Sequence, residues 1–430
     1  MTTAAYHGAQ PSLAGAGTLR ERLLLAVLFV TTLAGAIAFV EPSPHDALMG
    51  PLAVACLIAG VTFDRMLAVP FLLLLIWNAS GLLSLTNVLD QDKTVQYTGT
   101  SVYLAVAAML YASMFAQNTM PRLATMRIAY IAAAVFSALA GAAGYFHLFA
   151  HADDLFTLYD RAMGAFKDPN VYATFLIWPA LFVIDRMVAR KIRITDAIII
   201  AILMLGLLLS FSRGAWFNFA VGCVIVVALA FLTAPGPRER WRVLTLSAVA
   251  IGALAVFVAF LLSFHTLSSM FESRAHLIQS YDVGQGGRFR LQELAIGAVL
   301  NFPNGMGPFE FARVNGLQQH NVYLQAFLVY GWVGGVAYLL LVMSTMTVGL
   351  RTALVRAPWQ PYAVTAFAAF VGDVLEGFVI DTDHWRHFFL LLGVIWGTAA
   401  ATSRARRDIA RLKAHPYSPP RSGRGVAQPG

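Results

Sequence analysis

Three arginines stand where polar residues interrupt an otherwise apolar chain. Arg213 lies in the middle of the apolar stretch 196–234, which is interrupted only by residues 210–214. Arg288 and Arg290 follow a Gly-Gly pair and open a segment with the pattern of an amphipathic helix. A planar guanidinium group suits the oxygens of a phosphate. The three arginines are therefore candidates for binding an anion such as a diphosphate.

A purely structural role is the alternative for two of these arginines. Arg213 could be a helix-end arginine whose charged head group reaches water. Arg290 can pair with Glu293, one turn further along its helix. Arg288 has no carboxylate three or four residues downstream, and it points to a different helix face from Arg290. We therefore assign Arg213 and Arg288 as the main anion-binding residues, with Arg290 as an additional one.

His320 ends the only long loop of the chain, residues 265–320. Imidazole titrates near neutral pH, so His320 is a candidate base for a hydroxyl nucleophile, although it could instead only orient that hydroxyl. His265 and His276 lie in the same loop. No two of these histidines have the helical spacing of zinc ligands, so the sequence favours a site without a metal.

Other polar residues are expected near the same level of the molecule. Aspartate and glutamate inside an apolar helix are costly and are usually paired or functional. The alternatives are helix starts and an interfacial cap anchored by a tryptophan. We expect supporting roles for Asn321, Asp168, Asn170, Asp373, Glu376, Asp383 and His384.

The composition requires these residues to be positioned by membrane helices. Apolar residues make up 58% of the 430 residues and charged residues 12%, and the mean hydropathy is +0.68. Such a chain cannot cover its surface with polar groups, and its unbroken apolar runs exclude a transmembrane barrel. We predict an all-α polytopic protein with about twelve spans. They lie near 23–40, 47–63, 66–88, 98–117, 128–149, 170–187, 196–212, 214–233, 244–264, 322–350, 361–380 and 388–402.

The stretch 196–234 shows how Arg213 is positioned. As one helix it would reach roughly 58 Å, which is too long for a single crossing. It must reverse close to Arg213, and Gly214 is expected to supply the backbone freedom for that turn. Cys56 and Cys223 both lie in apolar stretches and indicate neither a disulfide framework nor a zinc site.

Charge sets the expected orientation. We divide the chain into a disordered tail (1–19), a membrane domain (20–402) and a basic disordered tail (403–430). Placing both termini in the cytoplasm puts most of the 30 basic residues on that side, as the positive-inside rule requires. The loop 265–320 then lies on the outer side. The net charge of +8 reflects this topology and contact with anionic lipid, so we expect no nucleic-acid partner.

Several segments together resemble the O-antigen ligase family, which also includes O-antigen and exopolysaccharide polymerases. The resemblance covers roughly residues 160–400. Family members often carry Trp four residues after the loop arginine, where this chain has Gln292. The matching segments are 166–170 (FKDPN), 212–214 (SRG), Gly287-Arg288, Pro303, 305–307 (GMG), His320-Asn321, Tyr323-Leu324 and Tyr330-Gly331.

The resemblance implies a multi-pass glycosyltransferase of the bacterial inner membrane with a periplasmic active site. Its donor would be an undecaprenyl-diphosphate-linked glycan, and transfer would invert the anomeric carbon without a metal or cofactor. The acceptor would be the lipid A core for a ligase, or another lipid-linked repeat for a polymerase. Arg213 and Arg288 would neutralise the diphosphate, and His320 would serve as the base. A polysaccharide transporter or flippase is the alternative from another class, but its binding residues usually lie near the membrane midplane.

Overall fold

The computed structural model describes residues 18–88, 91–189, 192–264, 268, 271–272 and 287–414. A helix lies at each of the twelve predicted spans, so the all-α polytopic fold is confirmed. The helices are α2 (Leu19–Ala34), α3 (Pro44–Ile58), α4 (Ala68–Ser84), α5 (Gln91–Phe115), α6 (Thr119–Tyr145), α8 (Pro169–Ala189), α9 (Ile194–Leu209), α10 (Arg213–Thr233), α11 (Pro237–Leu262), α15 (Val322–Ala353), α16 (Gln360–Glu376) and α17 (Arg386–Ala414).

Eight helices in the described ranges are long and apolar enough to cross a membrane, and α3 and α9 are shorter apolar helices. The remaining two, α2 and α16, have 16 and 17 residues. α17 continues past the predicted end of its span to Ala414. There Arg404 and Arg407 pair with Asp64, which caps the 3₁₀ helix η1 (Arg65–Leu67), at 3.1 and 3.4 Å.

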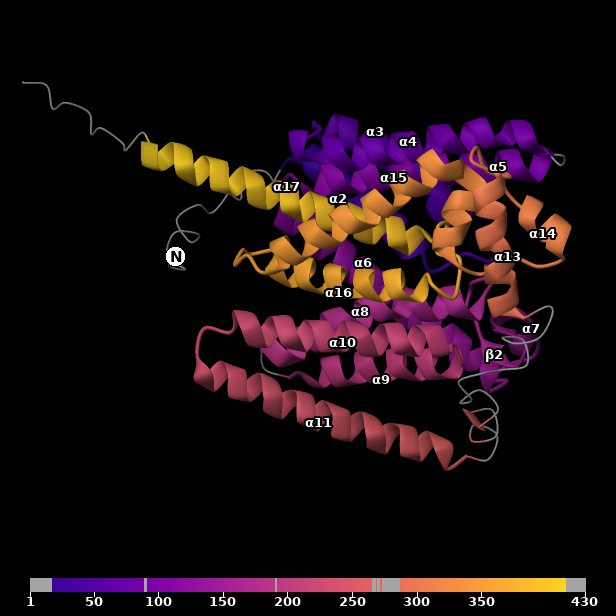
Figure 1. Ribbon diagram of the computed structural model, residues 1–430. Coiled ribbons are helices and arrows are strands. Elements are labelled where there is room, and N and C mark those ends of the chain that lie inside the picture. The colour runs from indigo at the N-terminus through magenta and orange to yellow at the C-terminus, as the bar shows by residue number, and fades with distance from the viewer. Residues whose placement is uncertain are drawn as a thin grey trace, which may run out of the picture.

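Small elements gather at one end of the helix bundle, which we call the loop end (Figure 1). They are α7 (Ala152–Phe156), the two-stranded β1 (Thr157–Leu158) and β2 (Arg161–Ala162), α13 (Arg288–Asn301) and α14 (Glu310–Asn315). α13 confirms the amphipathic helix predicted after Gly287. The C-terminal half of α17 projects from the opposite end (Figure 1).

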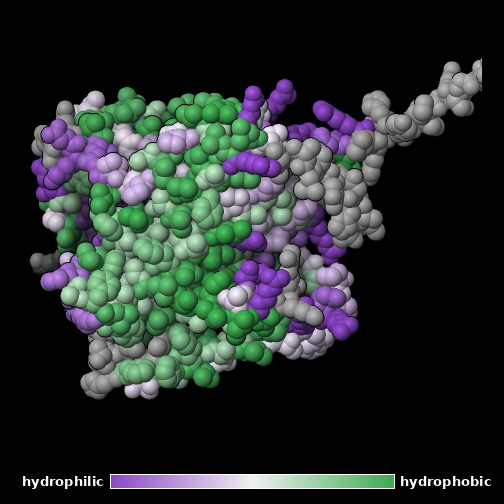
Figure 2. Space-filling model, turned by 180° about the vertical axis from the view of Figure 1, so that it is seen from behind, coloured by the Kyte–Doolittle hydropathy of each residue, from purple (hydrophilic) through white to green (hydrophobic). Residues whose placement is uncertain are grey.

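The helices differ in how much of their surface is buried in the bundle. α8 and α17 are the most buried spans, whereas α11 lies at the periphery and is almost wholly exposed. Figure 2 shows a broad apolar face in the middle of the molecule, with hydrophilic residues toward two opposite sides. An exposed apolar helix is stable in lipid, where it meets hydrocarbon instead of water.

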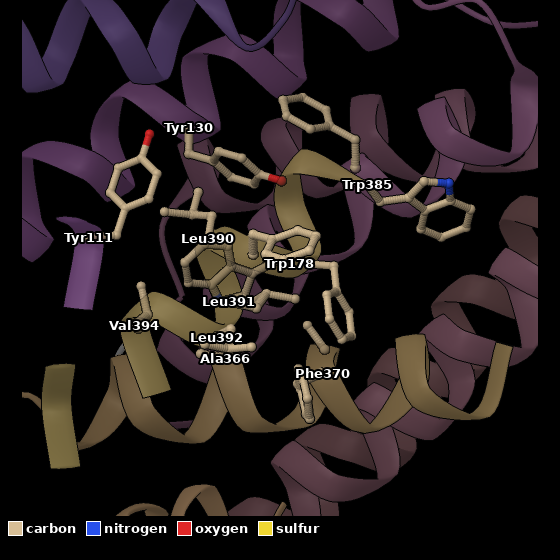
Figure 3. Packing of buried hydrophobic residues seen from close by; sticks show 14 of the residues in the cluster. Tyr111, Tyr130, Trp178, Ala366, Phe370, Trp385, Leu390, Leu391, Leu392 and Val394 are labelled. Atoms are coloured by element: carbon tan, nitrogen blue, oxygen red, sulfur yellow. The ribbon is translucent and has the colours of Figure 1, made fainter. Parts of the chain in front are cut away.

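Aromatic and aliphatic side chains fill the centre of the bundle. Trp178 of α8, Phe370 of α16 and Leu391 of α17 are each no more than 2% exposed and come together in one cluster (Figure 3). Trp178 is also anchored by polar contact, because its Nε1 donates to Thr365 Oγ1 at 3.3 Å. The cluster fixes α8, α16 and α17 relative to one another, and these helices carry much of the polar chemistry of the loop end.

A break in α15 explains the glycine-rich part of the family motif. Gly331 has φ 67° and interrupts the helical backbone, and Gly305 approaches it with φ 81°. A Cβ at either position would lie 2.7–2.8 Å from backbone atoms of the other segment. The break also exposes backbone groups that the loop satisfies: Trp332 N donates to Pro303 O at 2.8 Å, and Met306 N donates to Leu328 O at 2.7 Å. These glycines therefore join the loop to α15.

Candidate active site

Arg213 projects from a tightly held turn. The chain reverses between α9 and α10, and Arg213 is the first residue of α10. Ser212 caps that helix and donates its hydroxyl to Asn170 Oδ1 at 2.8 Å. Arg161 donates to the same oxygen and to the Ser210 carbonyl, at 2.8 and 2.6 Å. Asn170, predicted as a supporting residue, therefore fixes the turn that carries the half-buried Arg213.

The expected role of Gly214 in this turn is wrong. The reversal places Phe211 in the left-handed region, with φ 48°, whereas Gly214 lies in the first turn of α10. Glycine is required at 214 for space instead of flexibility. A Cβ there would lie 2.8 Å from Glu376 Oε1. Sequence alone could not show this, because Glu376 belongs to a helix distant in sequence.

The end of α16 contacts the residue that follows Arg213, the residue that follows His320, and a residue one helical turn after Arg288. We call residues 376–378 the α16 terminus. The Glu376 carboxylate lies against Gly214, which follows Arg213. The Gly377 carbonyl accepts from Val322 N at 2.8 Å, at the start of α15. The Phe378 carbonyl accepts from Asn321, which follows His320, and from Gln292 of α13, both at 3.2 Å.

The helix α13, which begins with Arg288, contacts this terminus through Gln292. Arg288 opens α13 and is half-buried, and Gln292 lies one turn further on the same face. Gln292 also donates to the His320 carbonyl at 3.4 Å. Arg290 is more exposed and pairs with Glu293 at 2.6 Å, so the pairing expected from the sequence is present. Arg288 rather than Arg290 therefore shares a helix face with the contacts to His320.

His320 has a carboxylate partner that the sequence did not reveal. Its Nδ1 lies 3.5 Å from Asp381 Oδ2, and its side chain is 47% exposed. Asp383 and Glu376, two of the expected supporting residues, contact other groups. Burial raises the pKa of the Asp381 carboxyl above its usual range, although contact with His320 opposes that shift. The backbone of His320 is left-handed, with φ 49°, a strained state for a residue other than glycine.

Asn321 holds His320 at the start of α15. Its side-chain oxygen accepts from Tyr323 N and Leu324 N at 3.0 and 3.1 Å, which caps the helix. Its amide nitrogen reaches the Phe378 carbonyl. The supporting role of Asn321 is thus to lock the helix start on which His320 sits.

Asp383 and His384 form a separate polar group behind His320. Tyr97 donates to Asp383 Oδ2 at 2.5 Å, and Gln325 donates to the Tyr97 hydroxyl at 3.1 Å. Burial raises the pKa of Asp383, but the adjacent His384 outweighs burial and holds that pKa below its usual value. For His384 burial lowers the pKa, and the Asp383 carboxylate outweighs it and raises the pKa. The two residues form an ion pair (3.2 Å) that stabilises the loop before α17.

Asp373 and Glu376 are paired, as expected for buried carboxylates. Asn218 of α10 donates its amide to Asp373 Oδ1 and to Glu376 Oε2, both at 2.9 Å. Thr174 of α8 donates to Glu376 Oε2 at 3.2 Å. These contacts tie α8, α10 and α16 together beneath the Arg213 turn.

Asp168 lies at a helix start, which was the structural alternative to a supporting role in the site. Its Oδ1 accepts from Asn170 N at 2.6 Å at the start of α8. Of the histidines considered for zinc, His265 and His276 lie outside the described residues. In the described ranges, no group of three or more His, Cys, Asp or Glu side chains is arranged to hold a metal ion.

The α16 terminus therefore contacts the three segments that carry Arg213, Arg288 and His320. Residues to which the sequence analysis assigned no role complete the arrangement. They are Asp381 beside His320, Gln292 between α13 and the α16 terminus, and Arg161, Ser212, Thr174 and Asn218 around the Arg213 turn. Asp381 has a sequence signal, since it begins the dense polar run 381–387. The other residues carry none that distinguishes them from ordinary helix-end residues.

Comparison with known protein families finds a sequence match over part of the chain. The family model described as O-antigen ligase matches residues 198–339. The matched region contains Arg213, Arg288 and His320 but ends before the α16 terminus. No curated protein matches the chain. This family comprises membrane glycosyltransferases of the ligase and polymerase type, and the resemblance to the O-antigen ligase family that the motifs predicted is confirmed.

Proposed function

We propose that the chain transfers a glycan from undecaprenyl diphosphate to a sugar hydroxyl, as an O-antigen ligase with the lipid A core as acceptor. The observation that carries this proposal is the convergence of three elements on the α16 terminus. The turn between α9 and α10 carries Arg213, α13 carries Arg288, and the start of α15 carries His320. Two cations and an imidazole match a leaving diphosphate and an attacking hydroxyl.

Arg213 and Arg288 neutralise the leaving group. As the bond between the anomeric carbon and the diphosphate oxygen breaks, negative charge develops on that oxygen. A diphosphate with two guanidinium groups beside it leaves without being protonated, and no metal is needed for this step. Arg290 is held in its pair with Glu293, so it contributes mainly to the positive field around the site.

His320 removes the proton of the acceptor. Its Nδ1 faces Asp381, which leaves Nε2 to accept the hydroxyl proton as the acceptor oxygen attacks the anomeric carbon. The new glycosidic bond forms on the face opposite the leaving diphosphate, so the configuration inverts. Asp381 stabilises the imidazolium that results. Undecaprenyl diphosphate departs with the electron pair of the broken bond, and the proton later passes to water.

The site belongs at a membrane surface. The donor has a diphosphate head group and a long prenyl chain, so its reactive end lies at the headgroup level. We place the loop end at the periplasmic face of the inner membrane and both termini in the cytoplasm. The basic segment Arg404–Arg411 at the far end of α17 supports this orientation through the positive-inside rule.

The test is reconstitution with a choice of acceptors. Purified protein in vesicles receives an undecaprenyl-diphosphate glycan together with either lipid A core or a second undecaprenyl-linked repeat. Glycosylation of lipid A core with release of undecaprenyl diphosphate is the expected result. Extension of the lipid-linked repeat alone would instead identify a polymerase. Passage of the donor across the membrane without any new glycosidic bond would contradict the proposal and favour a flippase.

A further inference from the structure

A cavity with a mixed apolar and polar lining opens at the loop end, and His384 and Trp385 form part of its wall. Its volume is about 150 Å³. Lys167 and Glu41, both about half exposed, form an ion pair of 3.1 Å at its mouth. Tyr111 and Tyr130, each no more than 3% exposed, also line it. Arg213, Arg288 and His320 do not line this cavity.

Three residues that line the cavity each carry a buried polar atom with no hydrogen-bond partner within the described part of the chain. The atoms are Thr32 Oγ1, Tyr130 Oη and His387 Nε2. Their residues are 4%, 3% and 6% exposed. A buried polar atom without a partner is destabilising, so groups of this kind are normally satisfied by a ligand or by ordered water. The three residues belong to α2, α6 and α17, and all of them line this one cavity.

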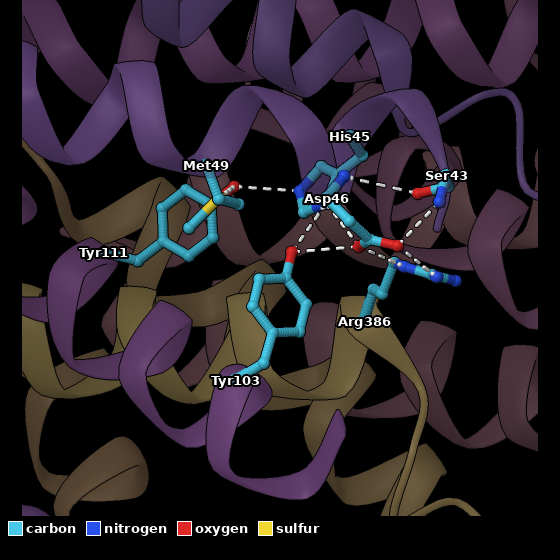
Figure 4. A network of polar contacts seen from close by, with 7 residues as sticks. All are labelled: Ser43, His45, Asp46, Met49, Tyr103, Tyr111 and Arg386. Atoms are coloured by element: carbon cyan, nitrogen blue, oxygen red, sulfur yellow. Dashed lines mark hydrogen bonds and ion pairs between the residues drawn. The ribbon is translucent and has the colours of Figure 1, made fainter. Parts of the chain in front are cut away.

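Two cations of the wall, Arg386 and Lys167, are already paired with carboxylates, and the Asp168 carboxylate also lines the cavity. Arg386 donates to both oxygens of Asp46, at 2.8 and 2.6 Å, and Tyr103 donates to the same carboxylate at 2.9 Å (Figure 4). Lys167 is paired with Glu41. A phosphate would have to compete with these carboxylates, so the cavity does not suit an anion. It suits a neutral molecule with several hydroxyl groups.

The remaining wall is aromatic. Phe166, Phe175 and Trp385 line the cavity together with the two tyrosines. A sugar ring combines an apolar face of C–H groups with hydroxyls around its edge, so aromatic walls with scattered hydrogen-bonding atoms are its usual environment. The volume is also about that of one sugar ring, or of roughly five water molecules at about 30 Å³ each.

The position of the cavity relates it to the proposed chemistry. Asp381 contacts His320, whereas His384 and Trp385 line the cavity. Three residues of extended chain span at most about 11 Å, so the Cα atoms of 381 and 384 lie within that distance. A glycan bound in the cavity could therefore place a neighbouring sugar next to His320.

We propose that this cavity is a saccharide subsite that binds one sugar residue of the glycan substrates. The inference rests on the proposed glycosyl transfer, and the sugar can come from either substrate. If the cavity binds a sugar of the acceptor, the hydroxyl of the next acceptor sugar would lie at His320. If it binds a sugar of the donor glycan, it would hold that glycan at a sugar other than the one that reacts. The wall residues bind and orient the sugar and take no part in the bond changes.

The test measures binding of lipid-free sugars to the full-length protein in nanodiscs. The probes are core oligosaccharide and donor oligosaccharide, each released by mild acid from the host's own lipopolysaccharide and lipid-linked glycan. Tyr130→Phe and Thr32→Val each remove one wall hydroxyl and keep the side-chain shape. Each variant should weaken binding of one probe by about fivefold, as expected for one lost neutral hydrogen bond.

Tyr172→Phe is the matched control. The Tyr172 hydroxyl is also buried without a partner in the described ranges, but it does not line the cavity. Tyr130→Phe, Thr32→Val and Tyr172→Phe should each have a melting temperature equal to or higher than that of the wild type, because each removes a buried hydroxyl that has no hydrogen-bond partner. The control should not change affinity. If Tyr130→Phe fails to fold, Thr32→Val carries the test.

The probe that responds identifies the source of the sugar, and the KM for the corresponding lipid-linked substrate should rise with it. Unchanged affinity for both probes in folded variants would overturn the subsite and leave a cavity filled only with water. Transfer by the wild-type protein could still stand in that case. Conversely, weakened probe binding in a protein that transfers to no acceptor would keep the subsite and refute the proposed function.

Discussion

Substitution of Asp381 by Asn tests whether His320 acts as a base with a carboxylate behind it. The change keeps the shape of the side chain and removes its negative charge. At the 3.5 Å between His320 Nδ1 and Asp381 Oδ2, an ion pair is worth about 1 kcal/mol in water and about 5 kcal/mol at an effective dielectric constant near 20. Because the His320 side chain is 47% exposed, solvent screening places the value near the lower end.

We therefore expect a moderate loss of activity. A stabilisation of about 1–2 kcal/mol corresponds to roughly a 5- to 30-fold lower rate of transfer in Asp381→Asn. His320→Ala should cost about 10²–10⁴-fold, as for loss of a general base. Donor binding should change little in either variant, since Arg213 and Arg288 hold the donor. The assay is single-turnover transfer, with donor affinity measured on the same preparations.

The pH dependence provides a second readout. Burial raises the pKa of Asp381, so its carboxylate becomes protonated as the pH falls through that raised value. Loss of the charge removes the stabilisation of the imidazolium, and wild-type activity should decline on this acid limb. In Asp381→Asn the contribution of Asp381 to that limb should be absent. A rate-against-pH profile of both proteins checks this.

Glu293→Gln is the matched control, because it removes a carboxylate from the same end of the molecule without touching His320. It should transfer at a rate close to that of wild type. In the double variant His320→Ala/Asp381→Asn, the second change should have no further effect if Asp381 acts through His320. Equal and additive losses, or an unaltered rate in Asp381→Asn, would refute the reasoning.

Four further outcomes are expected. Arg213→Lys and Arg288→Lys keep the charge but lose the bidentate fork, so each should lower transfer at least about tenfold while the protein still inserts; near-normal rates in both would mean that these arginines only anchor helices. Transfer should persist in excess EDTA, and activity that is lost and then restored by one divalent cation would assign the diphosphate to a metal. Gly331→Ala should destabilise the protein by about 1–3 kcal/mol in thermal unfolding, because φ is 67° and the new Cβ would lie 2.7 Å from Pro303 O; an unchanged melting temperature would contradict the tight contact. Val314→Cys, on the exposed face of α14, should react with an impermeant thiol reagent in intact spheroplasts, with the parent protein as background; labelling only after lysis would reverse the orientation.

The sequence by itself determined the helices and several local features. Apolar runs of span length form helices because every backbone group must be hydrogen-bonded within the segment in lipid. The reversal near Arg213 follows from the length of the stretch 196–234, and α13 follows from its amphipathic pattern. The Arg290–Glu293 pair follows from helical spacing alone. All these features depend on residues that are close in sequence.

Only the tertiary structure decided which distant residues meet. Asp381 lies beside His320 because α15 and α16 pack together and bring the loop before α17 to the start of α15. Gly214 appeared to be a turn glycine, but the Glu376 side chain occupies the space beside it. Residue type and spacing identify groups capable of chemistry. Their pairing depends on the crossing of helices far apart in the chain, which local spacing does not specify.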